Sequence, residues 1–260
     1  MMFLLNFLIL LGGLQNEPLH QVDPPVPESR TLPIASPTFW GKIMVEPETS
    51  DFDNDADTVS YAATKIRIGL LRTRLHYDLN KNRIDLDSVK QVFGDRLINH
   101  VIPYWYGTGW SFGGHTSVPK EGKIACGYFV STTLNDMGLK LDRYKLAQKS
   151  PIDEAKALSC GTKITTIAHE DPEQALAQIN EHIKKGVYFI GFDTGHVGFL
   201  VKKKGKLFLV HSNYLSPVSV CIEPLETAKV FKTFTKFHLV DISNNEKLIE
   251  KWLNNDVVLR

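Results

Sequence analysis

The chain has 260 residues, of which 43% are hydrophobic and 23% are charged, with a formal net charge of +1. This composition is ordinary for a globular protein that buries one core. A charge balance this close to zero gives neither the basic excess typical of nucleic-acid binding nor the acidic excess of a solvating tail. The basic run 202–206 is expected to be a solvated hairpin tip, so we expect no nucleic-acid partner.

The N-terminus begins with an apolar run, residues 1–14, that is too short to cross a bilayer as a helix. A Pro-rich stretch follows, which is the order of an export signal and a linker. The sequence therefore predicts a signal peptide over residues 1–15, a linker over 16–37, no stable membrane span, and export to the periplasm or the medium. The alternative is an apolar element packed on the domain, because the run lacks a basic start and Asn6 interrupts it. If N-terminal sequencing of secreted protein returned Met1, the predicted signal peptide would be wrong.

Residues 38–260 are expected to form one domain, whose first part, 38–99, is a helical extension. Apolar residues recur at helical spacing over 58–76 and again over 87–100. A short strand is expected near 38–45. The acidic turn 51–57 is expected to cap the first helix, since it lacks the glycine and the closing glutamate of a calcium loop.

An aromatic loop, 103–114, leads to a helix expected over 126–137, which begins at Cys126 and is stopped by Gly138. The next helix is expected to start at Pro172, with Asp171 as its N-cap, and to end near residue 185.

After that helix the hydrophobic pattern changes to short runs typical of strands. We expect a hairpin about the basic run and a helix at the C-terminus, with the strands over 187–192, 196–201, 207–213, 218–222 and 235–242, and the helix over 245–253. Helices followed by an antiparallel sheet define the α+β class.

Cys126 stands at the start of its helix, where backbone N–H groups and the helix dipole favour a thiolate. His196 opens a strand, and His211 and Asn213 share one face of the next strand because they are two residues apart. A thiol, an imidazole and a third polar group suit nucleophilic attack on a carbonyl carbon. If Lys204 and Gly205 form the turn, Asn213 lies opposite His196 and His211 is its diagonal neighbour.

Three motifs in chain order resemble the NlpC-type family of papain-like cysteine peptidases, which cut peptide bonds in bacterial cell-wall stems. They are Cys126-Gly-Tyr-Phe-Val, Gly195-His-Val-Gly-Phe-Leu-Val and Phe208-Leu-Val-His-Ser-Asn. The segment Tyr104-Trp-Tyr-Gly107 is similar to the family's Tyr-x-x-Gly, whose hydroxyl helps to bind the oxyanion. The resemblance covers residues 100 to 240. It implies a papain-like fold, with the nucleophile helix packed on a C-terminal antiparallel sheet.

The resemblance also implies roles for four residues: Cys126 as nucleophile, His196 as base, His211 as the residue that orients the imidazole, and Tyr104 as an oxyanion donor. His211 is preferred to Asn213 on this ground alone, since the chemistry allows both. The implied activity is an exported cysteine hydrolase that cleaves an amide bond in peptidoglycan peptides. An amidase, acyltransferase or transglutaminase-like enzyme would use the same residues, and a catalytically inactive module would use the cleft to bind a peptide or glycan.

The chain departs from the family pattern at the nucleophile, where Ala125-Cys-Gly-Tyr replaces the usual Asp-Cys-Ser-Gly. The loop after Tyr104 is also longer and carries Trp110 and Phe112, which implies a reshaped cleft. A live thiol is expected to react with iodoacetamide well below pH 8.5, about the pKa of a free cysteine.

Three cysteines in an exported protein suggest one disulfide and one free thiol. Cys160 and Cys221 are the candidate pair, which leaves Cys126 free, and three reduced cysteines are the open alternative. No pair of histidines has a metal-ligand spacing and no Gly-rich phosphate loop follows a strand, so we expect neither a metal nor a cofactor.

Overall fold

The computed structural model describes residues 60–193 and 195–260. The signal peptide, the linker, the strand near 38–45, the acidic turn 51–57 and the start of the helical extension are all expectations that lie outside this part of the chain. In the described part, no helix has both the length and the apolar character that crossing a membrane requires.

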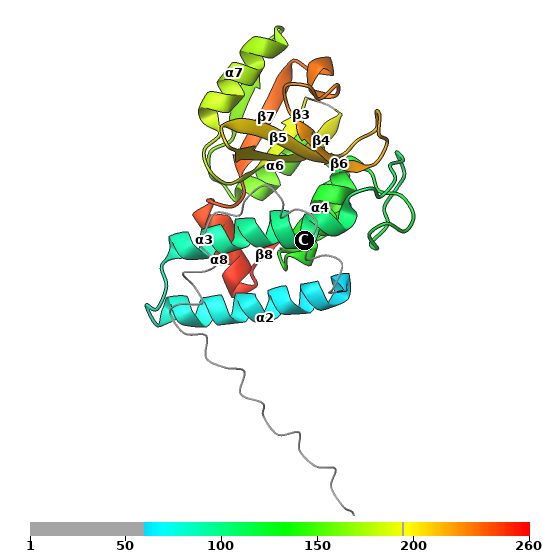
Figure 1. Cartoon of the computed structure of the whole chain (residues 1–260). Helices are drawn as coiled ribbons and strands as arrows, with labels where there is room; N and C mark the ends of the chain where they lie inside the picture. Colours follow the sequence, from blue (N-terminus) through cyan, green and yellow to red (C-terminus); the bar gives the residue numbers. More distant parts are fainter. Residues whose placement is uncertain (1–59, 194) are drawn as a thin grey trace, which may run out of the picture. The chain divides into compact units, whose positions relative to one another are not determined.

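Both expected helices of the extension are present, but the second one changes its winding along its length. The α-helix gives way to a π-helical turn and then to a 3₁₀ turn, and the elements are α2 (Tyr61–Asn80), α3 (Leu86–Asp95), η1 (Arg96–Val101) and η2 (Ile102–Trp105). The side chains of Ser60 and Asp85 cap the two α-helices by accepting from backbone N–H groups. The C-terminal helix α8 (Glu246–Asn254) packs against both α2 and α3 (Figure 1).

The expected strands form an antiparallel sheet of six strands in the order β2-β7-β3-β4-β5-β6. Five were predicted from the sequence, and their bounds are β3 (Val187–Phe192), β4 (His196–Lys203), β5 (Lys206–Ser212), β6 (Val220–Pro224) and β7 (Lys236–Asp241). The strand β2 (Thr165–Ala168) was missed, because only one of its four residues is buried and the run is too short to show an alternating pattern. The α+β class is therefore observed.

The hairpin that carries the two site histidines has the expected register. Lys203 pairs with Lys206 and Phe199 with Val210, and the turn residues Lys204 and Gly205 have φ angles of 48° and 77°. Positive φ at both positions is the mark of a type I′ turn, which fixes the register of a two-residue hairpin. Gly198 is required beside this pairing, because a Cβ there would lie only 2.9 Å from the carbonyl oxygen of Val210.

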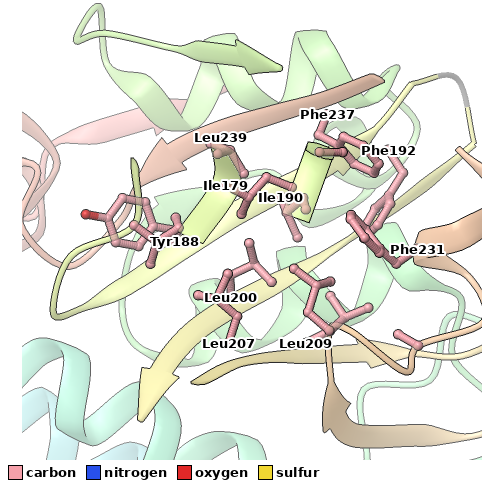
Figure 2. Packing of buried hydrophobic residues seen from close by; sticks show 14 of the residues in the cluster. Ile179, Tyr188, Ile190, Phe192, Leu200, Leu207, Leu209, Phe231, Phe237 and Leu239 are labelled. Carbon is pink, nitrogen blue, oxygen red and sulfur yellow. The ribbon is translucent and has the colours of Figure 1, made fainter. Parts of the chain in front are cut away.

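Helices cover both faces of the sheet. On one face α7 (Pro172–His182) buries Ile179 against Ile190 and Leu239 of the strands (Figure 2). Its N-cap is Asp171, as expected, although it ends three residues earlier than the sequence predicted. On the other face α4 (Cys126–Asp136) packs against β4 and β5, and α6 (Pro151–Ser159) packs against β3 and β7 (Figure 1).

The remaining elements are short and were not predicted. A helix of one turn and a small parallel ladder follow α4, and a 3₁₀ turn precedes β7: α5 (Arg143–Ala147), β1 (Lys140–Leu141) paired with β8 (Val257–Leu259), and η3 (Phe231–Thr233). The three cysteines are free thiols, so the candidate pair Cys160–Cys221 is not formed. Cys160 follows α6 on the β3–β7 side, whereas Cys221 lies in β6 at the opposite edge of the sheet.

Candidate active site

Cys126 is the first residue of α4, and the chain before it is held in place by a backbone bond. The N–H of Ala125 donates to the carbonyl oxygen of Gly114 at 2.8 Å. The sulfur of Cys126 accepts from the backbone N–H of Val197, the residue that follows His196 in β4. The contact places the thiol beside the backbone at the start of the histidine strand. Among the described residues no hydrogen bond joins this sulfur to the ring of His196, whose Nδ1 has no partner.

The electrostatics of the resting thiol differ from the expectation. Burial raises the pKa of Cys126 to about 11, and the charge of Glu154 acts in the same direction. The N–H groups of Val197, Gly127 and Cys126 itself lower the pKa but do not offset the burial. The prediction of a thiolate favoured at the helix start is therefore wrong for the resting site, because desolvation outweighs the helix terminus.

Two histidines and a glutamate form a hydrogen-bonded chain across three neighbouring strands. Nε2 of His196 lies 2.8 Å from Nδ1 of His211, and Nε2 of His211 lies 2.9 Å from Oε1 of Glu223. The two rings meet edge to face, with centroids 5.0 Å apart. His196 and His211 are both fully buried, so little solvent competes with these bonds.

The carboxylate of Glu223 sets the direction in which protons are donated along these hydrogen bonds, because a carboxylate can only accept. An ionised carboxylate has no proton to donate, so Nε2 of His211 carries the proton that Glu223 accepts. Nδ1 of His211 is then an acceptor, and Nε2 of His196 donates to it. This assignment leaves a lone pair on Nδ1 of His196, which is buried without a hydrogen-bond partner among the described residues.

His196 is neutral in this setting. Burial, and in second place the repulsion that His211 exerts when it is protonated, hold the pKa of His196 well below its usual 6.5. A neutral imidazole with a free lone pair is the form that can take a proton from a thiol.

Asn213, the rival for the third position, serves another partner. Its Nδ2 donates to Oε1 of Glu223 at 3.3 Å and to the carbonyl oxygen of Ser216 at 3.2 Å, while its Oδ1 accepts from the N–H of Leu215. Asn213 therefore braces the carboxylate, and His211 is the residue in contact with His196. The catalytic role of His211 stays a prediction.

Glu223 is a site residue that the sequence analysis missed. His211 pairs with Cys221 across the β5–β6 ladder, so Glu223 lies two residues along on the same face. The strand was expected to end at residue 222, which excluded the glutamate. The sequence does show a charged residue directly after the apolar run of this strand. Its position near His211, however, depends on how the irregular loop 213–219 sets the pairing of β6 with β5.

The group formed by His211, Cys221 and Glu223 is where a metal ion could bind, since its ligand-type atoms lie within 4.8 Å of one another. However, the nitrogen and oxygen of His211 and Glu223 are 2.9 Å apart. Two ligand atoms on one tetrahedral zinc ion would be about 3.3 Å apart. Burial and the charge of Glu223 also raise the pKa of the Cys221 thiol to about 11. In this arrangement His211 and Glu223 are hydrogen-bonded to each other and are not spaced as ligands of one metal ion.

Tyr104, the expected oxyanion donor, lies in η2 against α2. Its hydroxyl is 3.0 Å from Oγ1 of Thr64, and its ring packs on Tyr61 with centroids 5.1 Å apart. Trp105 donates to the hydroxyl of Tyr61, which in turn donates to Asp136 at the end of α4. The helical extension thus fixes the position of η2 relative to α4, and the oxyanion role of Tyr104 stays a prediction.

The aromatic loop covers the buried histidine. Trp110 packs on Tyr214 with centroids 5.9 Å apart, and Tyr214 meets the ring of His196 edge to face at 5.4 Å. The backbone N–H of Trp110 donates to the carbonyl oxygen of Val218, which ties the loop to the segment before β6. Phe112 takes no part in this packing, since it is 90% exposed.

Comparison of the sequence with protein-family models and with curated proteins finds no match. Function is therefore argued from the geometry of the site.

Proposed function

We propose that this protein is a papain-like cysteine hydrolase that cleaves an amide bond with Cys126 as nucleophile and His196 as base. The observation that carries the proposal is the relay from Glu223 through His211 to His196, whose Nδ1 is buried without a partner in the described part of the chain. The sulfur of Cys126 is bound by the next residue of the same strand. The packing of α4 on β4 and β5 supports a papain-like arrangement.

The mechanism begins from a neutral pair, because the thiol and the imidazole are both uncharged at pH 7. Nδ1 of His196 takes the thiol proton as the sulfur attacks the carbonyl carbon. His211 stabilises the imidazolium and Glu223 orients His211. The imidazolium then protonates the leaving amine, and a water molecule activated by the same nitrogen hydrolyses the thioester. The N–H of Cys126 and the hydroxyl of Tyr104 are the proposed donors to the oxyanion.

Peptidoglycan stem peptides are the proposed substrate, on the resemblance of the three motifs. An acyltransferase or transglutaminase-like enzyme would form the same thioester and pass it to an amine. Incubating the protein with purified muropeptides and weighing the products separates these outcomes, because hydrolysis adds one water across the broken bond and transfer adds an amine. Muropeptides that stay intact at every pH tested would favour the inactive binding module.

Alkylation of Cys126 by iodoacetamide is expected to need alkaline pH in the resting protein. Its rate follows the thiolate fraction, which rises about tenfold per pH unit below a pKa of about 11. Below pH 8 the protein should therefore react more slowly than a short cysteine peptide. Burial raises the pKa of Glu154 well above its usual value, so its carboxylate opposes the thiolate only once it ionises. Glu154→Gln removes that opposing charge, so the variant should react at a somewhat lower alkaline pH. A wild-type rate that is already level near pH 7 would contradict a partly buried thiol that is protonated at rest.

A further inference from the structure

The outward face of α2 exposes large apolar side chains to solvent. Ile66 and Leu70 are 66% and 64% exposed, and Tyr77 is 47% exposed. No other isoleucine, leucine or valine in residues 60–193 and 195–260 is as exposed as the first two. Single exposed apolar residues are common on protein surfaces, but a group of them on one face marks a site of protein or membrane binding.

These three side chains and Ala62, which is also exposed, form one stripe along the helix, the α2 stripe. They follow one another at intervals of four, four and seven residues, which keeps them on one side of an α-helix. At a rise of 1.5 Å per residue, the stripe from Ala62 to Tyr77 is about 22 Å long. The opposite side of α2 faces α8 and η1 (Figure 1) and buries Thr64, Ile68 and Leu75. The helix is therefore apolar on two sides, and only one of them is packed.

Positive charge borders the α2 stripe. Residues 60–84 contain six basic side chains and one acid, Asp78, whereas the whole chain has a net charge of +1. Asp78 is buried and is shared by Arg74 and Arg83, at 2.6 and 3.3 Å, so it presents no negative charge to the surface. Arg67 is exposed next to Ile66 and forms no ion pair with any residue that the structure describes. The border of the stripe thus has an excess of positive charge and suits an anionic partner.

The end of the stripe combines an aromatic ring with two cations. Nζ of Lys81 lies 6.0 Å from the ring centroid of Tyr77, and the guanidinium carbon of Arg83 lies 5.2 Å from it. A tyrosine with an apolar ring and a polar hydroxyl, next to basic side chains, is typical of the boundary between a bilayer and water. Aliphatic side chains, a tyrosine and bordering cations on one helix face are the features of a helix that lies on a membrane surface.

We propose that the α2 stripe docks on a bilayer that contains anionic phospholipids, with the helix axis parallel to the surface. Ile66 and Leu70 enter the headgroup region, and the bordering cations meet the lipid phosphates. A lipid surface supplies negative charge along the whole border and needs no groove of matching shape. A second copy of the chain fits less well, because pairing two α2 helices along the stripe would bring their basic borders together.

The inference does not depend on the proposed function. Thr64, whose Oγ1 lies 3.0 Å from the hydroxyl of Tyr104, is on the packed side of α2. The contact between α2 and η2 is therefore on the side of the helix that faces away from the docked bilayer.

The test measures how the full chain partitions onto vesicles in a sedimentation assay. One set of vesicles is pure phosphatidylcholine, and the other contains about a quarter phosphatidylglycerol, which is anionic. We expect the partition coefficient to be about tenfold or more higher on the anionic vesicles at low salt, and to fall as salt is added. Residues 1–14 are the same in the wild type and in every variant, so their contribution cancels when the proteins are compared.

Two variants remove the two features of the stripe separately. The double variant Ile66→Gln and Leu70→Gln keeps residues that favour a helix and should lower the partition coefficient on anionic vesicles at least about tenfold. Arg67→Gln should lower it about three- to fivefold at low salt. The matched controls are Phe112→Gln, which removes a ring that is 90% exposed on the aromatic loop, and Lys229→Gln, which removes an exposed cation between β6 and β7. Both controls should bind as the wild type does.

A second measurement reports whether α2 itself enters the bilayer. Lipids with brominated acyl chains quench the fluorescence of an indole that lies among them. Leu70→Trp should show quenching beyond that of the four native tryptophans, and Phe112→Trp should not.

Three results would overturn the inference. The first is a wild type that binds anionic vesicles no better than neutral ones, and the second is a double variant that binds as well as the wild type. The third is a wild type that dimerises in solution without vesicles while the double variant stays monomeric, since the stripe would then be covered by a second copy of the chain.

Discussion

Cys126→Ala is expected to abolish muropeptide cleavage while the protein keeps its fold. Alanine keeps the helix start intact, since the N-terminus of α4 is held by the backbone bond from Ala125 to Gly114 and not by the sulfur. The reaction loses its nucleophile, so turnover should fall by at least about 10⁴-fold. Product formation is measured by mass, and unfolding by heat is measured on the same sample.

The matched control for this variant is Cys160→Ala, which removes another partly buried thiol on the same side of the sheet. It should leave cleavage unchanged. Full cleavage by Cys126→Ala would remove the proposed mechanism, and equal losses in both variants would indicate a general effect of removing a buried thiol.

The hairpin that carries His196 and His211 could be predicted because its register is set locally. The turn at Lys204 and Gly205 determines every pair that follows along β4 and β5, so a diagonal contact between the two histidines could be expected from the chain alone. The start of α4 at Cys126 and its stop at Gly138 were likewise local signals.

The features that escaped prediction depend on contacts between distant segments. Glu223 reaches the site through the irregular loop between β5 and β6. The raised pKa of Cys126 results from burial, which no local pattern of residues reports. The hydroxyl of Tyr104 is hydrogen-bonded to Thr64, which lies forty residues earlier in the chain. These are tertiary properties, and they decide the chemistry of the site.

Glu223→Leu is expected to lower kcat about 10²- to 10⁴-fold with little change in KM, because the carboxylate is the only group in the relay that fixes the direction of its protons. Without an acceptor at Nε2 of His211, that ring is free to place its proton on Nδ1 and donate to His196. The proton of His196 then moves to Nδ1, the atom that must receive the thiol proton.

The tautomer of His196 can be determined by NMR, independently of any activity measurement. In the wild type the ¹⁵N resonances of His196 should show a protonated Nε2 and a bare Nδ1, and in Glu223→Leu this pattern should reverse or become mixed. Glu223→Gln keeps an oxygen that can accept, so it should retain the wild-type tautomer and lose less turnover.

His211→Ala should lower turnover far more than Asn213→Ala, because His211 is hydrogen-bonded to His196, whereas Asn213 is hydrogen-bonded to Glu223. Cys221→Ala is the matched control, since Cys221 lies directly opposite His211 in the ladder and its removal leaves every bond of the relay in place.

If Cys221→Ala lost as much activity as Glu223→Leu, and a chelator inactivated the wild type, then His211, Cys221 and Glu223 would be ligands of a metal ion. If Glu223→Leu kept both its turnover and its tautomers, the carboxylate would have no part in holding the base ready for Cys126.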